Sequence, residues 1–383
     1  MTTLTATVVA GSGKPGTGRV TFTAPAGALS TASETLDARG QATATFTCAV
    51  QSDPACHRTV RIDAVWEQGA ERAEDSAGVA VGMPLPVDVK DGGGTLANDA
   101  GLAADCSGVV GAELVLATTG RPEDIVTDGV SVFWTDSMLG TVNKRALAGG
   151  APVVLASGLT TPMSIGLDAS SVYWSSYPAK GLFRVSKAGG AATSIYPETA
   201  FRLHLASGFV FFTTSNSRTV LKVPTSGGAF TKVADEPDLP SAVIASSNAT
   251  YWVTDTSGHV MKSVGAGAPV QLATGLGRAT TLALTTDRVV WGTTSGTIGS
   301  VSTAGGSPAT LFSGLGFVGF LITSQESLYW SEYGRSTVSK GDVSGGTPVV
   351  LASGQSSPGG LTVAGSCLYW VNRGSGELMR AKR

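Results

Sequence analysis

Residues 162–174 read PMSIGLDASSVYW, and residues 358–370 read PGGLTVAGSCLYW. Both stretches start at a proline, place an apolar residue three positions later, and end in Tyr-Trp. The closing aromatic residue occurs seven times at a spacing of 38 to 40 residues, at Trp134, Trp174, Phe212, Trp252, Trp291, Trp330 and Trp370. A fixed period near 40 indicates a repeat architecture.

Each repeat contains the signals of four short strands. After the aromatic residue come a polar turn, an alternating run such as residues 181–185, and a glycine pair such as Gly189-Gly190. A last apolar run ends in a signature such as residues 155–158, LASG. Four short strands with turn residues between them are typical of one blade of a β-propeller. Seven copies predict an all-β chain with a seven-bladed β-propeller over residues 113–383.

The two ends of the repeat region complement each other. The final repeat stops at Arg383 after its third strand, and residues 113–120, ELVLATTG, carry the fourth-strand signature ahead of the first repeat. We therefore expect the strand at 113–118 to complete the last blade and to close the propeller. Such a seam would remove the open edges of the repeat array.

The four cysteines suggest two disulfides. Cys48 and Cys56 flank a turn-rich stretch containing Asp53-Pro54, and Cys106 and Cys367 should both lie at the same rim of blade seven. The alternative is four free buried thiols. No CxxC spacing or Cys/His cluster argues for zinc, and we expect no metal and no cofactor.

The N-terminal part of the chain differs from the repeats. Residues 1–82 alternate like short strands separated by Gly, Pro and Ser turns, which predicts a β-sandwich. The runs LTATV at 4–8 and GRVTFT at 18–23 resemble bacterial Ig-like domains of the invasin/intimin type. Residues 83–112, with Pro84, Pro86 and three consecutive glycines, are expected to be a linker; their aspartates do not match a calcium loop.

Charge and composition exclude some classes of partner. The net charge of −2 gives no electrostatic basis for binding nucleic acid or an anionic membrane. We see no apolar run near 20 residues, so membrane insertion is not expected. Met1 already begins a strand-like run, and the paired cysteines favour an extracytoplasmic protein. We expect a monomer that is secreted, periplasmic or at the cell surface, with its secretion signal outside this chain.

The residues around each aromatic marker resemble a known repeat family. Residues 133–136, FWTD, are similar to the YWTD repeats of lipoprotein-receptor propellers and their bacterial relatives, whereas residues 211–214, FFTT, and 290–293, VWGT, differ most. In that family these residues pack and cross-link the blades, so the resemblance implies an architecture and no ligand. We accordingly expect the aromatic series to be core packing rather than a recognition surface.

Candidates for chemistry are few. His204 and Asp124 lie on inner strands two blades apart, where His204 is expected to approach the central channel. Among the seven inner positions ten residues before each marker, Asp124 is the one carboxylate, which is a poor basis for a metal site. No Gly-x-Ser-x-Gly or phosphate-binding loop is present in the sequence. We do not expect an enzyme, although a metal-dependent propeller hydrolase or lyase is the alternative.

The favoured function is an extracytoplasmic binding or scaffold protein that presents one propeller rim to a protein or glycan partner. Arginine and tyrosine mixed with acidic residues fit such a surface. The candidate binding residues are Arg121, Asp136, Tyr177, Arg202, His204, Arg218, Asp255, His259, Glu332, Tyr333, Arg335 and Arg373. Most of them follow an aromatic marker, in the polar turns of the expected rim.

Overall fold

The computed structural model describes the strands within residues 2–80, residues 105, 106 and 109, and residues 111–383 other than 119, 180 and 266. The chain divides into two compact units, Met1–Leu85 and Pro86–Arg383. Every regular element of the described residues is a β-strand. These residues therefore contain no helix that could cross a membrane.

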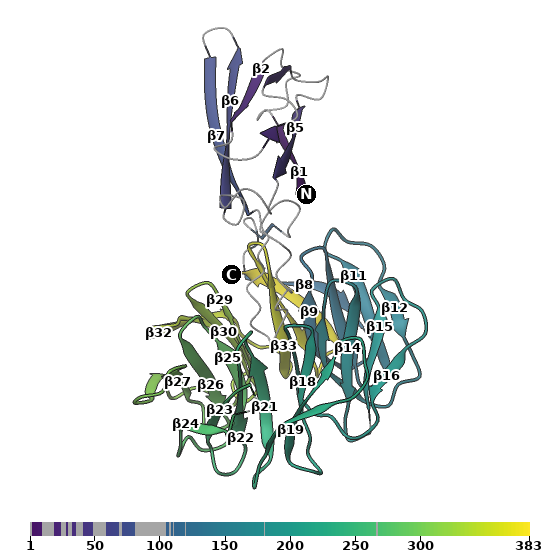
Figure 1. Ribbon diagram of the computed structural model, residues 1–383, viewed down its shortest axis with the longest axis vertical. Coiled ribbons are helices and arrows are strands. Elements are labelled where there is room, and N and C mark those ends of the chain that lie inside the picture. The colour runs from purple at the N-terminus through teal and green to yellow at the C-terminus, as the bar shows by residue number, and fades with distance from the viewer. Residues whose placement is uncertain are drawn as a thin grey trace. The chain divides into compact units, whose positions relative to one another are not determined.

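The first unit contains two antiparallel sheets (Figure 1). One has the strand order β1-β5-β3 and the other β4-β2-β6-β7. Their bounds are β1 Thr2–Val9, β2 Arg19–Thr23, β3 Ala28–Leu29, β4 Ser33–Thr35, β5 Gln41–Cys48, β6 Thr59–Gln68 and β7 Glu71–Ala80. Cys56 and most of the expected linker lie outside the described residues, so the Cys48–Cys56 pair stays a prediction.

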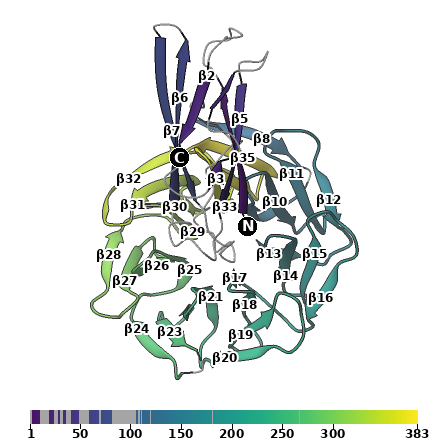
Figure 2. The same cartoon turned by 45° about the horizontal axis from the view of Figure 1, so that its top comes forward.

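The second unit is a seven-bladed β-propeller of seven four-stranded sheets. Figure 2 shows the sheets in a ring, with the first strand of each repeat on the inside. Blade one is β9 Pro122–Thr127, β10 Ser131–Asp136, β11 Thr141–Ala146 and β12 Val153–Ala156. Blade two is β13 Pro162–Leu167, β14 Ser171–Ser176, β15 Leu182–Ser186 and β16 Thr193–Tyr196. Blade three is β17 Leu203–Ala206, β18 Phe209–Thr213, β19 Thr219–Pro224 and β20 Thr231–Asp235. Blades four and five are β21 Pro240–Ala245, β22 Ala249–Thr254, β23 Val260–Val264 and β24 Val270–Ala273; and β25 Ala279–Leu284, β26 Arg288–Thr293, β27 Ile298–Ser302 and β28 Ala309–Phe312. Blade six is β29 Val318–Ser324, β30 Ser327–Glu332, β31 Thr337–Asp342 and β32 Gly345–Ala352.

Blade seven combines strands from both ends of the repeat region. Its order is β33 Pro358–Ala364, β34 Cys367–Asn372, β35 Glu377–Lys382 and β8 Ala112–Ala117. Strand β8 pairs antiparallel with β35, with Ala117 opposite Glu377 and Ala112 opposite Ala381. The predicted Cys106–Cys367 disulfide is confirmed, with the two Cα atoms 5.2 Å apart. This bond ties the segment before β8 to the start of β34.

The core lies between neighbouring blades. The seven aromatic markers are at most 3% exposed, which confirms their expected packing role. Between blades one and two, for example, Phe133 and Val142 pack with Ile165 and Trp174. Apolar burial of this kind supplies most of the driving force for folding. It also orients each inner strand so that alternate residues face the next blade or the previous one.

A second repeat-wide contact lies one residue before the marker. In six blades an aromatic residue there pairs across the strands with Lys or Arg, as Tyr251 does with Lys262. The Lys262 Nζ lies 5.8 Å from the Tyr251 ring centroid and donates to the Thr303 carbonyl of blade five at 2.7 Å. In blade five the pair is Val290 and Ser300. Aromatic and cation are thus present together or replaced together.

Candidate functional site

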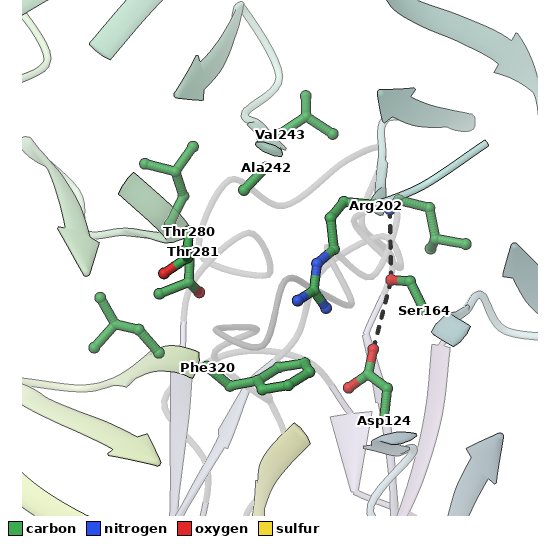
Figure 3. Close-up of a pocket in the computed structure, with 11 residues that line it drawn as sticks. Asp124, Ser164, Arg202, Ala242, Val243, Thr280, Thr281 and Phe320 are labelled. Carbon is green, nitrogen blue, oxygen red and sulfur yellow. Dashed lines mark hydrogen bonds between the residues drawn. The ribbon is translucent and has the colours of Figure 1, made fainter. Parts of the chain in front are cut away.

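A cavity occupies the central channel near the start of the inner strands (Figure 3). Its walls come from at least six blades, because the residue ten positions before each marker faces inward. The space is partly open to solvent, and its volume of about 420 Å³ includes that open part. The inward residues of blades one to six are Asp124, Ser164, Arg202, Ala242, Thr281 and Phe320.

Arg202 extends furthest into this space. Figure 3 shows its guanidinium group in the middle of the channel, between Asp124 and Phe320. Its Cζ lies 4.6 Å from the Phe320 ring centroid and 5.4 Å from that of Phe201, within the range of cation–π attraction. Within the described part of the chain, no acceptor receives a hydrogen bond from the Arg202 side chain, although its backbone N–H donates to Thr213 Oγ1.

Asp124 is held against the channel wall. Its Oδ1 accepts the N–H of Ile125 at 2.9 Å, and its Oδ2 accepts the N–H of Ile165 at 3.1 Å. The Ser164 hydroxyl donates to Oδ2 at 3.5 Å. A Cβ on Gly360 would lie 2.2 Å from Oδ1, so glycine is needed beside this carboxylate. Asp124 therefore links the inner strands of blades one and two and packs closely against Gly360 of blade seven.

Next to the channel, Glu123 is the centre of an ion-pair cluster. It is 4% exposed, and its Oε2 lies 2.6 Å from Arg373 Nε while its Oε1 lies 3.1 Å from Arg121 Nε. Ser137 Oγ donates to the same Oε1 at 2.6 Å. Both carboxylate oxygens are therefore occupied by groups of the protein. Removing either cation would leave a buried charge with fewer partners, which is costly.

Tyr333 extends this cluster toward blade six. Arg373 Nη1 donates to the Tyr333 hydroxyl at 2.9 Å, and the Tyr333 ring packs edge-on against Phe317 with centroids 4.9 Å apart. Burial raises the pKa of Tyr333, which the charges of Arg373 and Arg202 offset in part. Burial alone would lower the pKa of Arg373. The interactions of its guanidinium group with Tyr333 and Glu123 are stronger than this effect, so the pKa of Arg373 is raised. The phenol stays neutral and the guanidinium charged near pH 7.

Two apolar side chains project beside the same cluster. Met138 is 73% exposed and Leu139 is 48% exposed, in the turn between β10 and β11. The turn is attached to Arg121, because the Ser137 N–H donates to the Arg121 carbonyl at 2.9 Å. We use the name mouth patch for Arg121, Met138, Leu139, Tyr333, Arg335 and Arg373.

Two of the expected binding residues, Asp136 and Glu332, are buried instead of presented. Asp136 is fully buried and accepts the N–H groups of Arg121 and Leu139, each at 2.9 Å. Glu332, 2% exposed, accepts the Gly316 N–H at 2.6 Å and the Trp330 indole at 2.9 Å. Their carboxylate oxygens accept backbone N–H groups in turns, where strand pairing provides no acceptor. The two side chains therefore stabilise the rim.

His204 does not line the cavity. It is 3% exposed, and its Nε2 lies 2.9 Å from the Ala245 carbonyl of blade four. Arg202 lies just before β17 and reaches the channel, whereas His204 lies within β17 and packs between blades three and four. Among the described residues, no group of three or more His, Cys, Asp or Glu could hold a metal ion.

The remaining candidates are spread around the rim. Arg218 donates to the Pro237 carbonyl at 2.7 Å, and Tyr177 packs on Phe201 with centroids 5.0 Å apart. Asp255 accepts both Nε and Nη2 of Arg278, at 3.0 and 2.8 Å. His259 is half-buried, and exposed Arg335 donates to the Gly314 carbonyl. The structure brings Arg121, Tyr333 and Arg373 together and leaves these others separate, except that Arg335 lies beside Tyr333.

The repeat itself contained a signal that explains Asp136 and Glu332. The residue two positions after each marker is Asp136, Ser176, Thr214, Thr254, Thr293, Glu332 or Asn372. Thr254 Oγ1 accepts the His259 N–H at 3.0 Å, and Thr293 Oγ1 accepts the Thr297 N–H at 3.0 Å. An oxygen-bearing side chain at this position in every repeat indicates a turn cap. Glu123, the centre of the cluster, carries no such repeat signal.

Comparisons with known proteins support the fold. No family model and no curated protein matches the chain. Among solved structures, an inactive variant of virginiamycin B lyase from Staphylococcus aureus, crystallised with quinupristin, matches with a TM-score of 0.63 at 14% identity, covering 71% of this chain and 99% of that one. The WD40 β-propeller domain of Doa1 matches with 0.59 at 13%, covering 71% and 97%. The computationally designed Ika8 protein matches with 0.55 at 11%, covering 70% and 98%. At such identities the matches establish the propeller fold alone.

Proposed function

We propose that this protein is a binding protein, not an enzyme, and that the mouth patch is the surface on which a protein partner docks. The observation that supports this most is the exposure of Met138 and Leu139 beside Arg121 and Arg373. Arginine, methionine and aromatic residues are enriched in protein interfaces, where apolar anchors are surrounded by polar groups. The propeller fold fits a binding or scaffold role.

The charged and apolar side chains of the patch indicate which kind of partner would fit it. Glu123 is enclosed by Arg121 and Arg373, so the charge presented to a partner comes mainly from the arginines, including exposed Arg335. An acidic segment carrying one or two apolar side chains would complement these groups. A glycan would make less use of the exposed Met138 and Leu139.

The disulfide and the buried aromatic series bear on the location and the family of the protein. The Cys106–Cys367 disulfide favours an oxidising compartment, and we propose an extracytoplasmic protein on that basis. The buried aromatic series supports a YWTD-like repeat. The two sheets of the first unit are compatible with an Ig-like domain that presents the propeller.

The test compares two apolar pairs of the same blade. Met138→Ser/Leu139→Ser removes the exposed pair of the patch, and Val153→Ser/Val154→Ser removes a pair on β12 in which each valine is 56% exposed. Each purified protein is used as bait on the envelope fraction, and captured partners are measured by quantitative crosslinking. We expect a partner that is captured by wild type and by the Val153→Ser/Val154→Ser variant but not by the Met138→Ser/Leu139→Ser variant. Equal capture by both variants, or binding to a glycan array instead, would contradict the proposal.

A further inference from the structure

We propose that the channel cavity is a separate ligand site that binds a carboxylate group through Arg202. This inference does not depend on the mouth patch or on its partner. It starts from a contrast between two arginines on the same side of the mouth. The Arg278 guanidinium is paired with Asp255 through two hydrogen bonds, whereas the Arg202 side chain donates none within the described part of the chain.

The placement of Arg202 keeps its donors available. The aromatic rings of Phe201 and Phe320 contact the guanidinium group, but they do not take up its N–H donors as a carboxylate or carbonyl oxygen would. Asp124, the acid on the adjoining wall, already accepts two backbone N–H groups and the Ser164 hydroxyl. A guanidinium group in a concave space with its N–H fork open is suited to bidentate recognition of a planar anion.

The opposite wall offers further complementarity. Thr281 of blade five lines the cavity, and within the described residues its hydroxyl has no hydrogen-bond partner, while the neighbouring Thr280 donates to the Val318 carbonyl at 2.8 Å. Ala242 and Phe320 supply apolar surface beside the cation (Figure 3). A ligand with an apolar body and a carboxylate end matches this lining.

The charge balance favours a carboxylate over a phosphate. Arg202 is the single cation among the residues lining the cavity, and Asp124 is the single acid there, within the described chain. A monoanion is neutralised by one arginine, but a dianion would keep an excess charge close to Asp124. The carboxylate could belong to a small free acid or to the C-terminus of a peptide.

The test is calorimetric titration of the full-length protein with four probes: benzoate, acetyl-Gly-Gly-Phe with a free C-terminus, the same peptide amidated, and inorganic phosphate. We expect saturable binding of benzoate, with the amidated peptide inactive. Binding of the free peptide as well identifies a chain end as a second source of the carboxylate. Arg202→Met should weaken binding by about 10- to 100-fold, the effect of losing a charge-assisted hydrogen bond.

Two control variants distinguish the loss of the Arg202 site from a general effect of charge and from misfolding. Arg202→Lys keeps the charge but not the fork and should bind with intermediate affinity. Arg278→Met, which removes an arginine that is already paired, should bind benzoate like wild type. The proposal is overturned if no carboxylate binds, if phosphate binds as tightly as benzoate, or if folded Arg202→Met and Arg202→Lys both bind like wild type.

Discussion

Arg373 and Arg202, on two sides of the channel mouth, are used in opposite ways. On the side of blades six, seven and one, Arg373 and Arg121 surround the buried Glu123, and Arg373 also donates to Tyr333. On the side of blades three to five, Arg202 extends into open space without an acceptor among the described residues (Figure 3). The first arrangement stabilises the propeller where the two ends of the repeat region meet. The second leaves donors available for a ligand.

The largest expected effect lies on the paired side. Glu123→Gln keeps the size of the side chain but removes the charge that Arg373, 19% exposed, needs. Since breaking a buried ion pair leaves an uncompensated charge, we expect a loss of about 3 kcal/mol in the free energy of unfolding. Urea denaturation measures this loss. Arg278→Gln, at an exposed pair, should have no measurable effect; similar losses for both variants would contradict the contrast.

A smaller effect is expected at Tyr333. Tyr333→Phe removes the acceptor of Arg373 Nη1 and should cost about 1 kcal/mol, the net value of an ordinary hydrogen bond. The pH dependence sharpens this prediction. Because the folded-state pKa of Tyr333 is raised by burial, the unfolded state loses its phenolic proton first. Stability present below about pH 10 should therefore fall as the pH rises through the unfolded pKa toward the folded one.

Thermal unfolding between pH 8 and 11 measures that slope. The variant should lose stability less steeply above pH 10 than wild type does. The remaining slope would come from Tyr173, Tyr196, Tyr251 and Tyr369, whose pKa values burial also raises. Identical slopes for wild type and Tyr333→Phe would show that the Tyr333 phenol does not contribute to this pH dependence.

The blades were predictable because their signals recur with the period. The seven buried aromatic markers define the number of blades, and the extra fourth-strand signature before the first repeat defines the position of β8. Cys106 and Cys367 could be paired from the sequence because both are expected at the same rim of blade seven. Packing between structurally similar repeats favours the same residue type at the same place, and this is visible in one sequence.

The site was less predictable because its residues break the period. Arg202 was expected at a rim, but its unpaired fork depends on the rings of Phe201 and Phe320, one of them three blades away. Glu123 becomes a buried ion-pair centre only because Arg373 of blade seven reaches across to blade one. The sequence predicts that Asp136 and Glu332 are surface groups because acidic residues in turns are usually exposed, whereas in the structure they accept backbone N–H groups.

The most direct test of the contrast observes the arginines themselves. In ¹H–¹⁵N spectra of the arginine Nε–H groups, benzoate should shift the Arg202 resonance, assigned by its loss in Arg202→Met, along a saturable curve. The resonances of Arg373 and Arg278, which are already paired with Glu123 and Asp255, should not move. An unmoved Arg202 signal, or equal shifts of all three arginines, would contradict the account.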